Sequence, residues 1–209
     1  MSTLTTLLAR AAADLSDAAH ATWSTDELTA HLRQTLHQLD LAAPVPTAAV
    51  LTPTAGSREL SLASLGAIVA LFDVWYPYAA AEAEQPPPRI AWRWLTADTL
   101  WLELDEPPDG VRQARVLYGA PYTVDGLDGA NLTTLDRYGE DLLVLGATAA
   151  AAEQLALART GAITVTTATP EQLAAWARSR RARFEAGLAR LAAGRAPSGD
   201  PRACWPEAV

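Results

Sequence analysis

The sequence is poor in several residue types, and each shortage excludes a class of protein. It has one cysteine, Cys204, among 209 residues, so no disulfide can form within the chain. Its longest apolar runs, such as 68–72 and 142–145, are far shorter than the roughly 20 residues that a membrane-spanning helix needs. The first residues lack the basic and then apolar pattern of a secretory signal. We therefore expect an intracellular protein that is not inserted in a membrane.

Lysine is absent, and all 16 basic residues are arginine, against 24 acidic residues. A GC-rich genome favours arginine without any functional demand, but arginine also forms bidentate ion pairs at interfaces. The net charge of -8 argues against a protein that holds nucleic acid through its overall field, because phosphate binding usually relies on clustered positive charge. We expect DNA near this protein to be tolerated rather than bound.

Patterns typical of catalysis and metal binding are also missing. Of the three histidines, only His31 and His37 fall in one expected helix, and their spacing places them on nearly opposite faces. No glycine-rich phosphate-binding loop occurs. The segment 125–129 is typical of a surface turn, although Asp125 and Asp128 leave a weak calcium loop or a hydrolase open. We expect a protein that is not an enzyme and has no catalytic, cofactor-binding or metal-binding residues.

Two helices are predicted near the start of the chain. Leucines separated by alanines in residues 4–15 have the spacing of an amphipathic helix. Ser24 and Glu27 have the spacing of a capping box, which predicts that a second helix begins at Thr25. That helix should end near Asp40, because prolines follow it.

Two further helices are predicted in the last third of the chain. Residues 142–153 have the spacing of a helix with one apolar face, and the alanines at 149–152 would let another helix approach closely. Thr169 and Pro170 mark the start of the last helix, which runs to about Ala193.

Between these helices the sequence alternates in the manner of β-strands. Branched and aromatic residues at 68–76 predict one strand, and the alternating runs 90–95 and 99–104 predict a hairpin. A turn at 107–110 leads into another strand at 111–118. We expect these strands to form one small antiparallel sheet.

The predicted fold class is therefore α+β: a mainly helical bundle of about four helices, with an inserted small antiparallel β module and an extended C-terminal tail. Residues 1–50 and 130–195 would form the helical core, residues 57–124 the β module, and residues 196–209 the tail.

Two groups of residues suggest binding surfaces, and each has a simpler interpretation. The first group is the arginine run of the last helix, Arg178, Arg180, Arg181 and Arg183. It forms either a solvated face or a set of contacts to carboxylates of a neighbouring copy. The second group is the set of tryptophans Trp75, Trp92, Trp94 and Trp101. They either fill the β module or a subunit contact, or they line a sheet face that binds a glycan or peptide.

The sequence resembles the head-to-tail connector (adaptor) proteins of long-tailed bacteriophages, in the form that carries a β insertion. The resemblance spans most of the chain, but its motifs are short and rich in common residues. They are residues 23–28 (Trp-Ser-Thr-Asp-Glu-Leu), 73–77 (Asp-Val-Trp-Tyr-Pro), 116–118 leading into 123–127, and 142–152.

The resemblance implies a structural protein of the virion neck, between capsid and tail, that is present in the host cytoplasm during assembly. Such proteins form a homo-oligomeric ring, usually of about twelve copies, which docks on the portal protein and continues the DNA channel toward a downstream neck or tail protein. DNA would pass through this channel during packaging and ejection without sequence-specific binding. Portal or subunit contacts are then expected at Arg178, Arg181, Arg202 and Trp205. A neighbouring neck component, either a stopper or a tail-completion protein, fits the same resemblance, and the tryptophan-lined binding module remains the alternative outside it.

Overall fold

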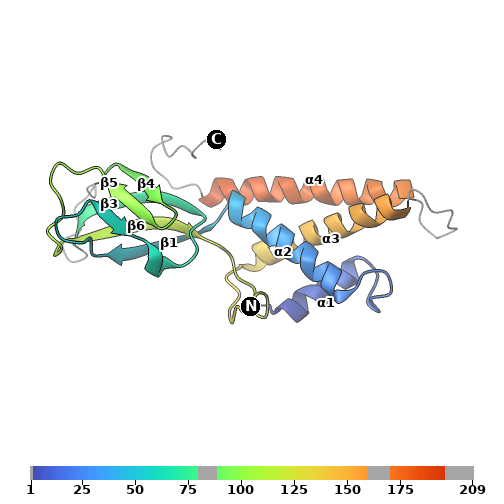
Figure 1. Ribbon diagram of the computed structural model, residues 1–209. Helices are drawn as coiled ribbons and strands as arrows, with labels where there is room; N and C mark the ends of the chain where they lie inside the picture. Colours follow the sequence, from blue (N-terminus) through green and yellow to red (C-terminus); the bar gives the residue numbers. More distant parts are fainter. Residues whose placement is uncertain (1, 80–88, 160–169, 196–209) are drawn as a thin grey trace. The chain divides into compact units, whose positions relative to one another are not determined.

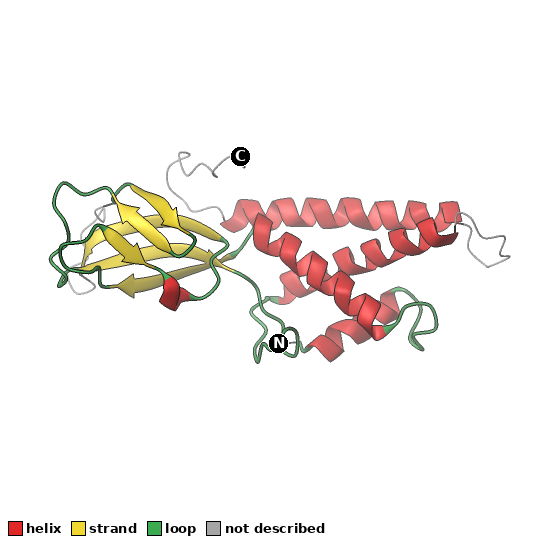
Figure 2. Ribbon diagram, viewed as in Figure 1, coloured by secondary structure: helices red, strands yellow, loops and turns green. Residues whose placement is uncertain are grey.

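The structure is a computed structural model, and it describes residues 2–79, 89–159 and 170–195. The chain divides into two compact units, one formed by residues 1–43 together with 122–196 and the other by residues 44–121. In the described residues, the α-helices belong to the first unit and the β-strands to the second (Figure 2). The fold class is α+β, as the sequence predicts.

The helical unit contains α1 (Leu4–Asp14), α2 (Thr25–Ala42), α3 (Arg137–Arg159) and α4 (Pro170–Arg195) (Figure 1). The predicted capping box of α2 is confirmed. Ser24 Oγ accepts a hydrogen bond from the backbone N–H of Glu27, and the Glu27 carboxylate accepts one from the backbone N–H of Ser24. α3 packs against each of the other three helices, and its contact with α4 is the most extensive.

Small residues on α3 allow this close packing. A Cβ atom at Gly146 would lie 2.5 Å from Thr35 Cγ2 on α2 and 2.9 Å from Phe184 Cε2 on α4. Ala149 and Ala152, which predicted a close approach of another helix, are fully buried. The absence of long side chains along this part of α3 therefore sets the distances to its neighbours.

α3 is also, among the described helices, long and apolar enough by length and composition to cross a membrane. Its apolar window is 56% buried within the protein, however, and the core helix of a soluble protein passes the same test. The window is weak evidence for a membrane span.

The loop between α1 and α2 is organised by one carboxylate. The buried side chain of Asp17 accepts hydrogen bonds from the backbone N–H groups of Ala21, Thr22 and Trp23 at 2.9 to 3.0 Å. Burial opposes the ionisation of Asp17, but the three donors together more than offset it and lower its pKa below the ordinary value. Asp17 thereby fixes the path of the chain into α2.

The second unit is a β-sandwich of two three-stranded antiparallel sheets. One sheet has the order β1 (Val45–Leu51), β6 (Gln113–Ala120), β3 (Ala70–Tyr78). The other has the order β2 (Glu59–Ser61), β5 (Thr99–Leu102), β4 (Trp92–Thr96), and a short 3-10 helix, Ala63–Leu65, follows β2. Both sheets contribute to one buried cluster, which includes Leu60, Leu100 and Leu102 from one and Val74 and Val116 from the other.

The sandwich confirms the predicted strands at 68–76 and 111–118 and the predicted hairpin, and it corrects two other predictions. The predicted hairpin is β4 and β5, with Trp92 opposite Leu102 and Trp94 opposite Leu100. The prediction of a single sheet was wrong, because β6 pairs with β1 and β3 instead of joining the hairpin. The assignment of residues 44–50 to the helical core was also wrong, because β1 lies there. β1 is an edge strand of its sheet. Proline has no backbone N–H to donate, and edge strands tolerate it, which explains why Pro46 can lie in β1.

Candidate partner interface

The arginine run lies on α4, and two of its members hold that helix within its own unit. Arg180 donates from Nε to Thr148 Oγ1 of α3 at 3.1 Å and pairs with Asp14, the last residue of α1. Its guanidinium also lies 4.7 Å from the ring centroid of Trp176. Arg180 therefore links three helices.

Arg181 makes a bidentate contact with Glu153 of α3. Its Nη2 lies 2.7 Å from Oε2 and its Nε lies 3.3 Å from Oε1, and both side chains are about one third exposed. The hydrogen bond to Glu153 raises the pKa of the Arg181 guanidinium above its ordinary value. The carboxylate partner of Arg181 in the structure thus belongs to its own chain.

Three other arginines of α4 lie on the side of the helix that faces away from the helical unit. Ala177, Phe184 and Leu191 are buried and recur every seven residues, which defines the inner face of α4. Arg178 and Arg183 fall outside this face and are exposed. Arg190, two helical turns after Arg183, is exposed as well. We call these three residues the outer arginines; none of them forms an ion pair with a described residue.

The expected contact residues therefore have different positions. Arg178 is exposed on the outer side of α4, whereas Arg181 is bonded to Glu153. Arg202 and Trp205 lie outside the described residues, and their role at a portal stays a prediction. Sequence reasoning missed Arg190, although the seven-residue recurrence of buried Ala177, Phe184 and Leu191 places Arg183 and Arg190 on one side of the helix.

The four tryptophans of the β module do not share a face. Trp92 and Trp94 lie opposite the buried Leu102 and Leu100, with ring centroids 6.2 Å apart; Trp92 packs against the core, whereas Trp94 is 41% exposed. Trp101 lies opposite Arg93 on the other side of that sheet, 5.7 Å from its guanidinium. This arrangement differs from the flat aromatic platform that a glycan-binding sheet would present.

The fourth tryptophan, Trp75, belongs to the other sheet. It lies opposite Arg115 of β6, whose guanidinium is 5.1 Å from the Trp75 ring and 5.2 Å from the Tyr78 ring. The Trp75 indole N–H donates to Asp73 Oδ2 at 2.8 Å. The polar groups of this tryptophan and its arginine are therefore occupied within the unit.

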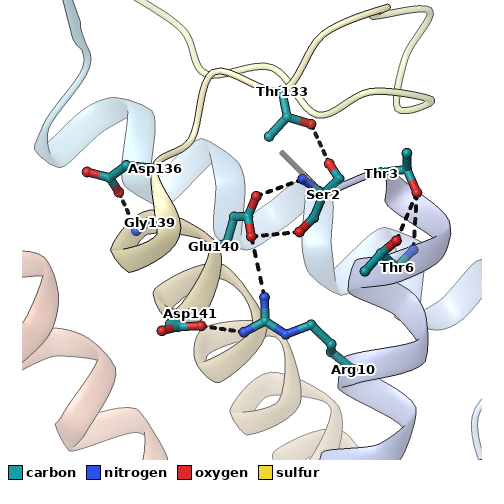
Figure 3. Close-up of polar contacts among 9 residues, drawn as sticks. All are labelled: Ser2, Thr3, Thr6, Arg10, Thr133, Asp136, Gly139, Glu140 and Asp141. Carbon is teal, nitrogen blue, oxygen red and sulfur yellow. Dashed lines mark hydrogen bonds and ion pairs between the residues drawn. The ribbon is translucent and has the colours of Figure 1, made fainter.

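A cluster of charged groups at the start of α3 fixes the N-terminal residues (Figure 3). The buried Glu140 carboxylate accepts hydrogen bonds from Ser2 N at 2.9 Å and from Ser2 Oγ at 2.7 Å, and Arg10 lies 3.5 Å away. Thr133 Oγ1 donates to the Ser2 carbonyl at 2.6 Å, and Arg10 also pairs with Asp141. Each of these groups binds another part of the chain, so the cluster has a structural role.

The described residues contain no group of three or more His, Cys, Asp or Glu side chains placed to hold a metal ion. The carboxylate of Asp128, weighed above as a hydrolase or calcium residue, is held by Arg33 through contacts of 2.7 to 3.2 Å. That hydrogen-bonded pair lowers the pKa of Asp128, which keeps it a charged surface carboxylate.

No protein-family model matches this chain, and no curated protein matches it. Its function must therefore be inferred from its own residues.

Proposed function

We propose that this chain is a structural subunit of a bacteriophage neck, a ring-forming head-to-tail adaptor that docks on the portal and continues the DNA channel toward the tail. In this role the protein assembles with copies of itself, in a ring of about twelve, and with the portal and a downstream neck or tail protein. It performs no chemical reaction, and DNA passes it without sequence-specific contacts.

The order of the elements carries this proposal. Two helices precede the inserted β-sandwich and two follow it, and both pairs pack into one helical unit. That order is the one predicted from the sequence patterns, and it is compatible with an adaptor that carries a β insertion.

The use of the polar side chains also supports a structural role. Asp17, Glu140, Arg180 and Arg181 bond to groups of their own unit, and in the described residues no buried side-chain nitrogen or oxygen lacks a hydrogen-bond partner. Polar groups in an enzyme site are commonly held ready for a substrate. The four side chains named above hold helices and loops of their own unit together.

Electron microscopy tests the proposal. The purified chain is mixed with the candidate portal encoded by the same genome, and particles are averaged with and without the chain. An added layer of density on one end of the portal ring is the expected result. Portal rings that look unchanged beside free chain would refute the adaptor role.

The same experiment separates an adaptor from a stopper or tail-completion protein. An adaptor binds the bare portal, whereas a component farther along the neck adds a layer only after another neck protein is bound. Adding the other neck proteins of the genome one at a time therefore assigns the position of this chain.

A further inference from the structure

Charge is unevenly distributed along this chain. α4 contains six arginines and two glutamates, which gives it a net charge of +4 in a chain whose net charge is -8. Arg180 and Arg181 are neutralised by Asp14 and Glu153 within the helical unit. Among the arginines of α4 whose side chains the structure describes, the outer arginines are those left without an ion pair inside the unit, and Glu171 and Glu185 are exposed on the same helix.

The outer arginines are spread along an exposed strip. Arg183 and Arg190 are seven residues apart, so they lie on one side of this strip about 10 Å from each other. Arg178 lies on its other side. The exposed residues between them, such as Ser179 and Ala182, are small, so a partner segment can reach both sides at once.

A matching acidic segment lies in the β-sandwich unit, directly after β5. Glu103, Asp105 and Glu106 are exposed and form no ion pair with a described residue. Nearby Arg58 donates instead to the carbonyl oxygens of Leu104 and Asp105, at 2.9 and 2.7 Å. We call residues 103–106 the acidic loop.

We propose that the outer arginines of one copy dock on the acidic loop of a second copy. The inference rests on the proposed ring and assigns its subunit contact. The two surfaces carry equal and opposite numbers of charges that have no described partner within the chain, and complementary surfaces of this kind determine which partners associate. In a ring, each copy would use its outer arginines on one neighbour and its acidic loop on the other, which is a head-to-tail contact.

Nucleic acid is the other polyanion that arginines attract. The overall charge of -8 repels DNA from the protein. Every copy of the chain, in contrast, carries both the outer arginines and the acidic loop, so a partner for α4 is always present. The charge distribution therefore favours a second copy as the partner.

A reciprocal charge exchange tests this inference in the full-length chain. The first variant carries Arg178→Glu, Arg183→Glu and Arg190→Glu, and the second carries Glu103→Arg, Asp105→Arg and Glu106→Arg. Each variant alone has like charges on both surfaces. An equimolar mixture restores opposite charges at each contact. Sedimentation equilibrium at low salt measures the association constants, and circular dichroism verifies that both variants are folded.

We expect the wild-type chain to associate, each variant alone to associate at least about tenfold more weakly, and the mixture to regain the wild-type association. Raising the salt from about 0.1 M to about 1 M should weaken the wild-type contact, because the screening length falls from roughly 10 Å to roughly 3 Å. If a reversal variant is unfolded, the corresponding glutamine variants, which remove the charges, should weaken association to a smaller extent.

A single pair of substitutions provides the matched control. Arg183→Gln and Arg33→Gln each remove one exposed positive charge, but Arg33 pairs with Asp128 of its own chain. Only Arg183→Gln should weaken association.

Three results would overturn the inference. A wild-type chain that remains monomeric at all accessible concentrations at low salt would do so, as would a mixture of the two variants that associates no better than either alone. Unchanged self-association of the arginine variant, together with its loss of binding to a double-stranded DNA fragment, would identify DNA as the ligand of α4. None of these results decides whether the chain adds a layer to the portal, so the adaptor proposal is tested separately.

Discussion

Replacing Gly146 by alanine should destabilise the helical unit, although the same change stabilises most helices. In an exposed helix interior, glycine costs about 1 kcal/mol relative to alanine. At Gly146 the added Cβ would lie 2.5 Å from Thr35 Cγ2 and 2.9 Å from Phe184 Cε2. Carbon atoms pack best at about 3.5 to 4.0 Å, so the neighbours would have to move by about 1 Å.

The surroundings of Gly146 leave little room for such a movement. Phe184 is 1% exposed, and Thr35 is held by a hydrogen bond from its hydroxyl to the His31 carbonyl at 2.9 Å. Overpacking of a filled core costs about 1 to 3 kcal/mol. Because the site is tight on two sides, the upper part of that range applies, and the net loss of unfolding free energy should be about 2 kcal/mol.

Urea unfolding followed by circular dichroism at 222 nm reports this loss, because the described α-helices all belong to the helical unit. Gly194→Ala is the control: it lies near the end of α4, where an added Cβ would meet nothing within 4 Å. Thr35→Ser, which removes the obstructing methyl group, should recover part of the loss in the double variant. A Gly146→Ala protein that is as stable as the wild type, or more stable, would refute the packing argument.

Three further predictions concern other contacts. Asp17→Asn should cost about 2 kcal/mol, because a charged acceptor of three N–H groups is lost. Since folding lowers the pKa of Asp17, its contribution is complete above the ordinary value of 3.8 and is lost as the pH falls through the folded pKa. The variant should therefore lose stability less steeply than the wild type in acid unfolding curves, and identical curves would argue against it. A double-mutant cycle of Arg181→Gln and Glu153→Gln should give a coupling of about 0.5 to 1 kcal/mol in urea unfolding, whereas a coupling near zero would mean that the pair does not fix α4. Gly119→Ala should loosen the β-sandwich, because its Cβ would lie 2.5 Å from Pro44 Cγ; we expect faster hydrogen exchange in β1 and β6, and unchanged protection there would contradict the close contact.

The sequence predicts local features of this protein well. The capping box of α2 depends on two residues three positions apart, and the start of α4 depends on the proline at its first position. The pairing of β4 with β5 follows from two alternating runs that are separated by a short turn. Each of these signals lies within a few residues of the structure that it determines.

Long-range pairing was less visible in the sequence. The sequence of β1 has no charged residue, and its apolar and polar residues hardly alternate. Its partner β6 follows more than 60 residues later. The division of the strands into two sheets depends on which strands pair, and local alternation carries no information about that choice.

The same limit applies to the candidate interface. The arginine run is plain in the sequence, but the separation of Arg180 and Arg181 from the outer arginines depends on carboxylates of α1 and α3. Those carboxylates, Asp14 and Glu153, are distant in the sequence and have no local signal that would pair them with α4. The helical period predicts only which arginines share the side of α4 that carries Phe184. It does not predict which carboxylates they bind.

The central claim is that this chain forms a ring on a portal, and the number of chains bound to one portal tests it most directly. Native mass spectrometry of the complex, assembled from the purified chain and the candidate portal, gives that number from the total mass. We predict one copy of the chain for each portal subunit, about twelve in all, with no stable partial rings. A portal that retains its own mass in the presence of excess chain, or that binds only one or two copies, would contradict the claim.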